Sequence, residues 1–286
     1  AGLDDDDRAR RQRFGRDLSL VRHGVEYVFR RDGGTGRPML WSLPVRLHRA
    51  VASAAPDVAH VNGLEFPAAV WQLRRVLGAK TAIALQDHGS VPPGHSGRRS
   101  AIRAFVDRHG FRVADGFMFT AAAQADPWRR AHRIGPSIPI YDVVEASTSM
   151  RAMPAAAAKA LSGVHGAPAV LWVGRLNGNK DPLTVLDGFE QSLRALPNAA
   201  LTMVYGADDL LESIRARLSC SPALRDRVRL VGQVSHDILS AYYSAADVFV
   251  LGSHREGSGY ALIEACACGA VPVVTDIPAF RAITSG

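Results

Sequence analysis

The chain has 286 residues, of which 47% are hydrophobic and 21% charged, with a formal net charge of +7. This length exceeds what one ordinary core organises and predicts two domains. Three cysteines supply no disulfide framework, and no apolar run approaches the roughly 20 residues that span a bilayer, so we expect a cytoplasmic protein rather than a disulfide-rich secreted domain or an integral membrane protein.

In chain order, the first half contains short apolar runs that are candidate strands. These runs are Val25–Phe29, Val58–Val61, Thr81–Leu85 and Phe117–Thr120. Longer segments separate them, which is the rhythm of strands that alternate with helices. The first half is therefore predicted to form a parallel sheet.

The second half repeats this rhythm more clearly. Its apolar runs are Ala169–Val173, Leu201–Tyr205, Val228–Val231, Val248–Leu251 and Val271–Thr275. Between them lie helix-like segments at about 181–195, 208–218, 236–246 and 259–268. Buried β-branched runs separated by amphipathic stretches are typical of a parallel sheet with helices on both faces. This half should be a doubly wound sheet.

The two halves are joined by small and polar residues between Glu145 and Gly166. We therefore expect an N-terminal domain over residues 1–148 and a C-terminal domain over residues 149–286. In open α/β sheets, ligands bind at the carboxyl ends of the strands. A site in a cleft between two Rossmann-like domains is the expectation.

The positive charge is concentrated in the first of these domains. Residues 1–148 hold 22 Lys or Arg and 15 Asp or Glu, whereas residues 149–286 hold 12 of each. A basic face is compatible with peripheral contact to an anionic membrane, although a solvated basic surface is the commoner outcome. No zinc-finger spacing or recognition helix accompanies the charge, so we expect no nucleic-acid partner.

The loop and helix after the run Val248–Leu251 carry the strongest chemical signal. Residues 257–260, Gly-Ser-Gly-Tyr, stand where backbone amides and the helix dipole attract phosphate. Glu256 and Glu264 bracket this turn. Carboxylates repel a phosphate unless another part of the ligand needs them, and a ribose diol or a sugar hydroxyl is such a part.

Cations follow the first strand of the same domain. Arg175 and Lys180 lie in a loop rich in Gly and Asn, and an Arg fork beside a Lys point charge suits a diphosphate. The loop is not a Walker A motif, because Asp181 follows Lys180 where Ser or Thr is required. The acids Asp4–Asp7 have no strand before them, so we expect a solvated run and no metal site there.

These residues together resemble a known family. The segments VGRLNGNKDPLTVL and RVRLVGQVSHDILSAYYSAADVFVLGSHREGSGYALIEACACGAVPVVTDIPAFR are similar to the carboxyl-terminal half of retaining glycosyltransferases of the GT-B fold, family 4. Glu256 and Glu264 match the paired-glutamate motif of that family. The first half resembles it more weakly, through PDVAHVNG and the QDHG that contains His88.

The resemblance implies a role for each matched residue. Glu264 would hold the ribose of a nucleotide-sugar donor, and Glu256 would hold hydroxyls of the donor sugar. Arg175 and Lys180 would bind the diphosphate and stabilise its charge as it leaves. Further donor contacts are implied for the backbone at Val234, Gly257, Ser258, Gly259 and Tyr260.

The first domain would supply His88, which the resemblance places at the end of a strand, facing the donor sugar and the acceptor. The family begins with a strand and a glycine-rich loop and continues beyond the donor site, whereas this sequence starts in a charged stretch and stops at RAITSG. We therefore expect a chain truncated at both ends, with an incomplete first domain.

The implied activity is that of a hexosyltransferase. It would move a hexose from a UDP- or GDP-sugar, as co-substrate, to a saccharide or lipid-linked acceptor, with retention at the anomeric carbon and with no metal or other cofactor. Two alternatives stay open: a sugar-nucleotide 2-epimerase of the same architecture, and a donor-binding protein without turnover.

Overall fold

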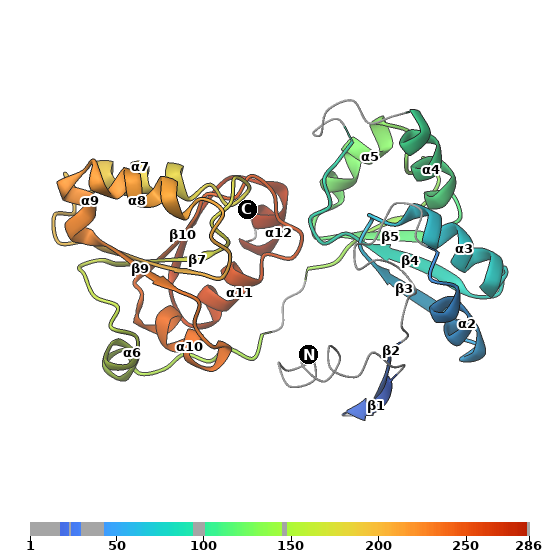
Figure 1. Ribbon diagram of the computed structural model, residues 1–286, viewed down its shortest axis with the longest axis horizontal. Coiled ribbons are helices and arrows are strands. Elements are labelled where there is room, and N and C mark those ends of the chain that lie inside the picture. Colours follow the sequence, from blue (N-terminus) through green and yellow to red (C-terminus); the bar gives the residue numbers. More distant parts are fainter. Residues whose placement is uncertain (1–17, 23, 30–42, 94–100, 145–147, 285–286) are drawn as a thin grey trace. The chain divides into compact units, whose positions relative to one another are not determined.

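The structure is a computed structural model that describes residues 18–22, 24–29, 43–93, 101–144 and 148–284. It divides into two compact units, Ala1–Tyr141 and Asp142–Gly286 (Figure 1). Each unit contains a parallel sheet with helices, which confirms the predicted α/β class. The division falls a few residues before Glu145, where the sequence places the start of the linker. The cleft between the domains stays a prediction.

The second unit is built on a five-stranded sheet in the order β11-β10-β7-β8-β9. All neighbouring strands are parallel. The strands are β7 (Ala169–Gly174), β8 (Ala200–Tyr205), β9 (Val228–Gly232), β10 (Val248–Leu251) and β11 (Val271–Val274). Each one falls on an apolar run identified in the sequence, so the predicted doubly wound sheet is confirmed.

Helices cover both faces of this sheet. In Figure 1, α7, α8 and α9 lie on one face, and α6, α10 and α11 lie on the other. The bounds are α6 (Ala155–Ser162), α7 (Pro182–Ser192), α8 (Leu211–Ser219), α9 (Pro222–Arg227), α10 (His236–Ala245), α11 (Tyr260–Ala267) and, after β11, α12 (Pro278–Thr284). Because both faces are covered, the central strands contain few polar residues.

Strand β7 shows why the apolar runs are continuous. Leu171 and Trp172 are consecutive and therefore point to opposite faces, yet both are fully buried. Leu201 and Met203 of the neighbouring β8 are also fully buried. Full burial of one such side chain contributes about 1.5–3 kcal/mol, so this layered core holds β7 in the middle of the sheet.

The strand order creates a topological switch point beside β7. The chain runs from β7 outward through β8 to β9, and it then returns to form β10 on the opposite side of β7. The loops after β7 and β10 therefore leave the carboxyl edge of adjacent strands. In open α/β sheets this is where ligands bind.

The first unit contains a four-stranded sheet in the order β3-β4-β5-β6. Its strands are β3 (Val58–Asn62), β4 (Ala82–Gln86), β5 (Gly116–Phe119) and β6 (Ile140–Asp142). Its helices are α2 (Val45–Ser53), α3 (Pro67–Leu77), α4 (Ala101–Phe111), the 3-10 helix η1 (Ala122–Ala125) and α5 (Asp126–Arg130). The pairs β3–β4 and β4–β5 are parallel. These three strands correspond to three of the four apolar runs for which the sequence predicts a parallel sheet.

The remaining run, Val25–Phe29, is assigned to the wrong sheet by the sequence prediction. It forms β2, which pairs antiparallel with β1 (Leu18–Arg22) in a separate two-stranded sheet. Arg22 is opposite Val25, so the turn has two residues, and Gly24 adopts a φ of 78° there. Such a short connection permits only an antiparallel hairpin, because parallel strands need a longer crossover.

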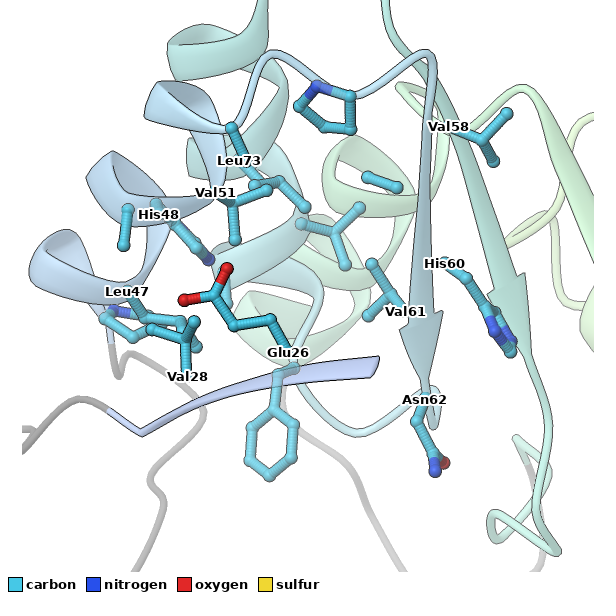
Figure 2. A pocket seen from close by; sticks show the side chains of 18 residues that line it. Glu26, Val28, Leu47, His48, Val51, Val58, His60, Val61, Asn62 and Leu73 are labelled. Atoms are coloured by element: carbon cyan, nitrogen blue, oxygen red, sulfur yellow. The ribbon is translucent and has the colours of Figure 1, made fainter. Parts of the chain in front are cut away.

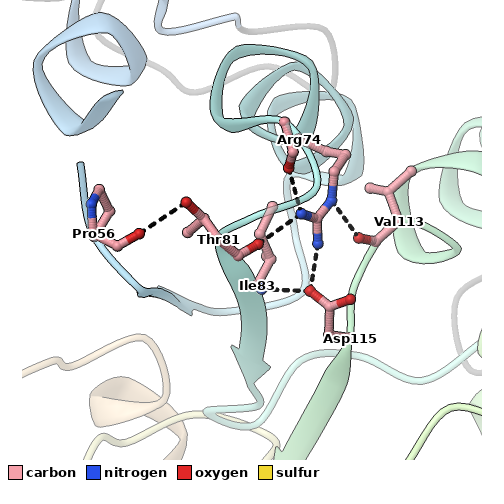
Figure 3. Close-up of polar contacts among 7 residues, drawn as sticks. Pro56, Arg74, Thr81, Ile83, Val113 and Asp115 are labelled. Atoms are coloured by element: carbon pink, nitrogen blue, oxygen red, sulfur yellow. Dashed lines mark hydrogen bonds and ion pairs between the residues drawn. The ribbon is translucent and has the colours of Figure 1, made fainter. Parts of the chain in front are cut away.

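Arg74 of α3 ties the amino ends of β4 and β5 together. Its guanidinium forms an ion pair with Asp115 and donates to the carbonyls of Val113 (3.1 Å), Gly78 (2.7 Å) and Thr81 (2.7 Å) (Figure 3). One side chain thus satisfies three carbonyls from the two loops that precede β4 and β5.

Asp115 extends this network to the strand beside it. Its carboxylate accepts the amide of Ile83 at 2.7 Å, and the hydroxyl of Thr81 donates to the carbonyl of Pro56 at 2.8 Å (Figure 3). The starts of β3, β4 and β5 are therefore fixed relative to α3, which also fixes where their carboxyl ends emerge.

We predict that Arg74→Leu lowers the free energy of unfolding of the first unit by about 2–3 kcal/mol, because it leaves partly buried carbonyls unsatisfied. Native-state hydrogen exchange of the β4 amides measures this unit by itself. Arg75→Leu is the matched control, since Arg75 is exposed and stacks on the Trp71 ring at 4.7 Å. Equal losses in the two variants would contradict the role given to the network.

Candidate functional site

The loop after β7, residues 175–181, is held in one shape by its own backbone. Leu176 is fully buried; its amide donates to Ala207 at 2.8 Å, and its carbonyl accepts from Leu210 at 2.9 Å. Both the backbone carbonyl and the side-chain oxygen of Asn177 accept the amide of Lys180 at 3.1 Å. These bonds close a turn between Asn177 and Lys180, and Arg175 is exposed at the strand end.

Asp181 ends this loop and begins α7. It adopts a φ of 42°, and its carboxylate accepts the amide of Thr184 at 3.3 Å and the hydroxyl of Thr184 at 2.9 Å. A side chain that accepts from the third helical residue is an N-cap, and Pro182 fills the first helical position, where no amide is needed. The cap fixes the direction in which the loop enters the helix.

The loop after β10 is bonded to the loop after β7. The amide of His254 donates to the carbonyl of Asn179 at 2.8 Å, and the side-chain amide of Asn179 donates to the carbonyl of Arg255 at 3.0 Å. The imidazole of His254 also contacts the Asp181 carboxylate at 3.0 Å. Hydrogen bonds therefore hold the two loops at the switch point together.

Gly252 permits this close approach. A Cβ atom at this position would lie 3.0 Å from the Val185 side chain and 3.1 Å from the carbonyl of Asp181. A larger residue would separate the loops after β10 and β7, so glycine is required here by space rather than by backbone conformation.

Lys180 and Glu256 meet where these two loops join. Their side chains form an ion pair, and only 18% of the Lys180 side chain and 12% of the Glu256 side chain are exposed. An ion pair this poorly solvated is stronger than one at the surface, and each charge is costly to leave without its partner. An ammonium has three N–H donors, so Lys180 can hold Glu256 and a second acceptor together.

Glu264 lies on α11 and is held by α10. The hydroxyl of Tyr243 donates to one carboxylate oxygen at 2.9 Å, and His236 Nε2 lies 3.9 Å from the other. Glu264 is 14% exposed, and burial raises the pKa of its carboxyl. Burial and the adjacent carboxylate also raise the pKa of Tyr243 well above its ordinary value. Tyr243 therefore remains a hydrogen-bond donor to a partly desolvated acid.

The turn between the two acids is sterically confined. Gly259 precedes α11 with a φ of 64°, and a Cβ there would lie 2.5 Å from the side chain of Ile283. Gly257 is buried, Ser258 is half-buried and Tyr260 is exposed. Glycine meets both demands at position 259, so this residue is favoured by geometry as well as by any ligand.

Val234 and His88 are the remaining candidates. Val234 is half-buried after β9 and packs against the core of the second unit. His88 belongs to the first unit, where it is exposed in the loop after β4. Asp87 shapes that loop by accepting the amides of Gly89 (3.2 Å) and Ser90 (3.0 Å), and burial raises the pKa of this carboxyl.

The structure thus brings Lys180 and Glu256 into contact and places Arg175 in the same loop as Lys180. Glu264 has different partners, and the assignment of all these residues to a ligand stays a prediction. The sequence analysis did not identify Tyr243, His254 or Asn179. Asn179 and His254 stand beside predicted site residues, which is a weak signal, whereas nothing in the sequence pattern marks Tyr243.

The described residues contain neither a metal-binding cluster nor a membrane-spanning helix. No group of three or more His, Cys, Asp or Glu side chains among them is arranged to hold a metal ion. The predicted solvated run Asp4–Asp7 lies outside the described residues. Within the same part of the chain, every helix is too short or too polar to cross a membrane.

We predict that Tyr243→Phe raises the pKa of Glu264 further, because the lost hydroxyl donates to the charged form of the carboxyl. The pKa is measured by a carbon-13 titration of the Glu264 carboxyl. Tyr242→Phe makes the same change one residue earlier on α10 and should leave that pKa where it is. An unmoved pKa in Tyr243→Phe would show that the bond does not support the carboxylate.

Comparison with known proteins finds relatives of the second unit. Residues 167–286 match the model described as Glycosyl transferases group 1. Mannosylfructose-phosphate synthase of Agrobacterium fabrum is 37% identical over 125 residues, which are 41% of this chain and 27% of that protein. GDP-mannose:cellobiosyl-diphosphopolyprenol alpha-mannosyltransferase of Xanthomonas oryzae pv. oryzae is 32% identical over 116 residues, 41% of this chain and 30% of that protein. The matches thus span less than a third of either relative.

Solved structures extend the likeness to both units. Sucrose-phosphate synthase from Thermosynechococcus elongatus aligns over 92% of this chain and 69% of its own, with a TM-score of 0.71 and 21% identity. HepE from Anabaena, in complex with UDP and glucose, aligns over 82% and 64%, with a TM-score of 0.66 and 16% identity. Residues 167–286 are therefore similar to the glycosyl transferases group 1 family, and the chain has the GT-B fold.

Proposed function

We propose that the second unit binds a nucleoside diphosphate sugar and that the chain takes part in transferring its glycosyl group to an acceptor. The observation that carries the proposal is the contact between Lys180 and Glu256 at the switch point of the sheet. It joins a cation suited to a diphosphate with an acid suited to sugar hydroxyls. The family match over residues 167–286 and the names of the relatives support the same reaction class.

Lys180 and Arg175 would bind the diphosphate. Lys180 is partly buried, with its backbone amide bonded to Asn177 and its ammonium paired with Glu256, whereas Arg175 is exposed at the end of β7. A held ammonium costs little reorganisation when charge develops on the leaving diphosphate, and electrostatic stabilisation of that charge is the main means of catalysis open to these residues. An exposed Arg can close over the diphosphate as a planar fork.

Glu256 would accept hydroxyls of the donor sugar. Because Glu256 pairs with Lys180, its carboxylate would lie beside the phosphate that carries the sugar, as a reaction at the anomeric carbon requires. Retention of configuration results when the bond from the anomeric carbon to the nucleoside diphosphate breaks on the same face on which the bond to the acceptor oxygen forms. We include retention and a hexosyl group in the proposal.

Glu264 would accept the ribose hydroxyls, because one carboxylate can accept two O–H bonds. Tyr243 already holds this carboxylate in place. The base would lie against residues 232–234, contacted mainly through the backbone. HepE was solved with UDP-glucose, whereas the name of the Xanthomonas relative specifies GDP-mannose, so we keep both nucleotides as candidate donors.

The first unit would face the acceptor and contribute His88. A saccharide or a lipid-linked saccharide is the proposed acceptor, since the Xanthomonas relative is named for a diphosphopolyprenol substrate. Peripheral contact of the basic first half with a membrane belongs to the same proposal. A thermal-shift screen across UDP-, GDP- and ADP-sugars, followed by a search for glycosylated acceptor, tests the reaction class. Epimerised nucleotide sugar without transfer, or binding without any turnover, would overturn it.

We predict that Glu256→Gln lowers turnover far more than donor affinity, because the amide keeps the size of the side chain and loses its charge beside the reacting carbon. We expect Glu264→Ala to weaken nucleotide binding by about tenfold or more, since it removes two charge-assisted hydrogen bonds. Steady-state kinetics and calorimetry measure the two effects.

The control for both variants is Glu212→Gln, which changes an 86%-exposed carboxylate on α8. It should leave turnover and affinity unchanged. If Glu256→Gln and Glu264→Ala both changed affinity alone and to the same degree, the roles given to the two acids would be wrong.

We also predict a pH dependence of donor binding. Burial raises the pKa of Glu264, so its carboxylate is protonated at a higher pH than an ordinary glutamate. Affinity for the nucleotide sugar should therefore be constant above that raised pKa and fall as the pH falls through it, because a protonated carboxyl accepts fewer hydroxyl bonds.

Calorimetry from neutral to acidic pH measures this dependence. Glu264→Gln should bind weakly at every pH without the acidic decline. His236→Gln, which alters the group 3.9 Å from the same carboxylate, should retain the decline. A decline that persists in Glu264→Gln would assign the titration to another group.

A further inference from the structure

Asp181, the residue that connects the loop after β7 to α7, has a backbone conformation that a residue with a side chain rarely adopts. Its φ is 42° and its ψ is 58°. Among the described residues of the second unit, every other residue with a positive φ is a glycine. Glycine reaches this left-handed region without a steric cost, whereas an aspartate there needs interactions that offset the strain. A strained residue beside a candidate site raises the question of what its side chain does.

The Asp181 carboxylate joins α7 to the loop after β10. It caps α7 through the amide and the hydroxyl of Thr184, and the oxygen that accepts this hydroxyl lies 3.0 Å from Nε2 of His254. An ionised carboxylate only accepts hydrogen bonds, so Nε2 of His254 carries the proton in this contact. A helix cap by itself needs no partner in another loop. The contact with His254 is thus an addition to the cap.

Bonds between the two loops lie on both sides of Lys180. Before it, the carbonyl of Asn179 accepts the backbone amide of His254; after it, Asp181 accepts from the imidazole of the same residue. His254 stands two residues before Glu256. The backbone of Lys180 is therefore fixed, one residue away on either side, against the loop that carries its ion-pair partner.

We propose that His254 is a positioning residue of the diphosphate site. Through Asp181 it fixes the backbone of Lys180 against the loop after β10, so that the ammonium is held where a diphosphate binds. This inference rests on the proposed function, because it assigns Lys180 to that ligand. The imidazole is 63% exposed and is bonded to Asp181, so its role requires no contact with the diphosphate.

The alternative is that the contact between His254 and Asp181 only stabilises the fold. Ion pairs this exposed contribute little to the free energy of unfolding, so stabilisation alone does not account for the strain at Asp181. The two accounts also differ in what they predict for Lys180. A contact that only stabilises leaves the pair of Lys180 and Glu256 as it is, whereas removal of a positioning contact weakens that pair.

The first test measures the pair of Lys180 and Glu256 without a ligand. A double-mutant cycle of Lys180→Met and Glu256→Gln, followed by native-state hydrogen exchange of the β7 amides, gives the coupling between the two side chains in the whole chain. In the His254→Ala background we expect this coupling, expressed as a ratio of unfolding constants, to fall by about threefold or more. An unchanged coupling would overturn the proposal.

Two conservative variants and a distant histidine make this result specific. His254→Gln places an amide N–H close to the position of Nε2 and should retain the coupling, whereas His254→Asn reaches only the position of Nδ1 and should lose it. The control is His165→Ala, which removes an exposed histidine before the amino end of β7 and should leave the coupling unchanged. Equal losses in His254→Gln and His254→Ala would contradict the role given to the Nε2 bond.

The second test adds the ligand. Calorimetry with UDP, GDP and ADP identifies the diphosphate that binds the unaltered protein most tightly, and its affinity is then measured in the variants. We expect His254→Ala and Asp181→Gly each to weaken it by about threefold or more. Glycine suits a φ of 42° and is tolerated as a helix cap, so Asp181→Gly should lose affinity with little loss of stability. Unchanged affinity in Asp181→Gly would contradict the positioning role.

The calorimetry must separate this site from a cavity of about 720 Å³ in the first unit, which is bounded by β2, α2, β3 and α3 (Figure 2). The described residues that line it are mostly apolar and include no lysine or arginine, so we expect no diphosphate there. His60→Ala changes an exposed histidine of β3 that lines this cavity, and it should leave the affinity unchanged. A loss equal to that of His254→Ala would place the ligand in the first unit and overturn the proposal.

The two tests separate this inference from the proposed function. If none of the three diphosphates binds the unaltered protein, the proposed function is wrong, and the double-mutant cycle still decides whether His254 positions Lys180. If a diphosphate binds and His254→Ala changes neither the coupling nor the affinity, the proposed function stands and the positioning role is wrong.

Discussion

The second unit depends on one constraint, which is that the chain returns to the side of β7 after completing β9. This return sets the loops after β7 and β10 side by side, and the bonds between Asn179, His254 and Arg255 hold them together. Lys180 and Glu256 are 76 residues apart in sequence and meet only because of it. A cation and an acid held at one sheet edge are what a sugar joined to a diphosphate requires.

The fold of this unit could be predicted because its strands are buried on both faces. Leu171 and Trp172 point to opposite faces of β7 and are both buried. A strand buried on both faces appears in the sequence as a continuous apolar run. The run at Val25–Phe29 was misplaced because its pattern does not distinguish a parallel neighbour from a hairpin partner. That choice depends on the preceding strand and on the two-residue turn at Gly24.

The candidate site could be predicted only in part, because the contacts of its residues depend on how distant parts of the chain pack. Charged and glycine residues after a strand are visible in sequence, which identified Lys180, Glu256 and Gly259 as candidates. Their partners are set by strand order and helix packing. Tyr243 supports Glu264 because α10 and α11 are neighbours on one face of the sheet, and no spacing rule relates these two residues.

The most direct test of this account compares the affinities of nucleoside diphosphates and their nucleosides by calorimetry, in matched pairs of uridine, guanosine and adenosine. The account predicts that the diphosphate strengthens binding in the unaltered protein. It also predicts that Lys180→Met reduces this advantage by about tenfold or more, because the partly buried ammonium supplies a charge-assisted bond. An advantage that is unchanged in Lys180→Met would contradict it.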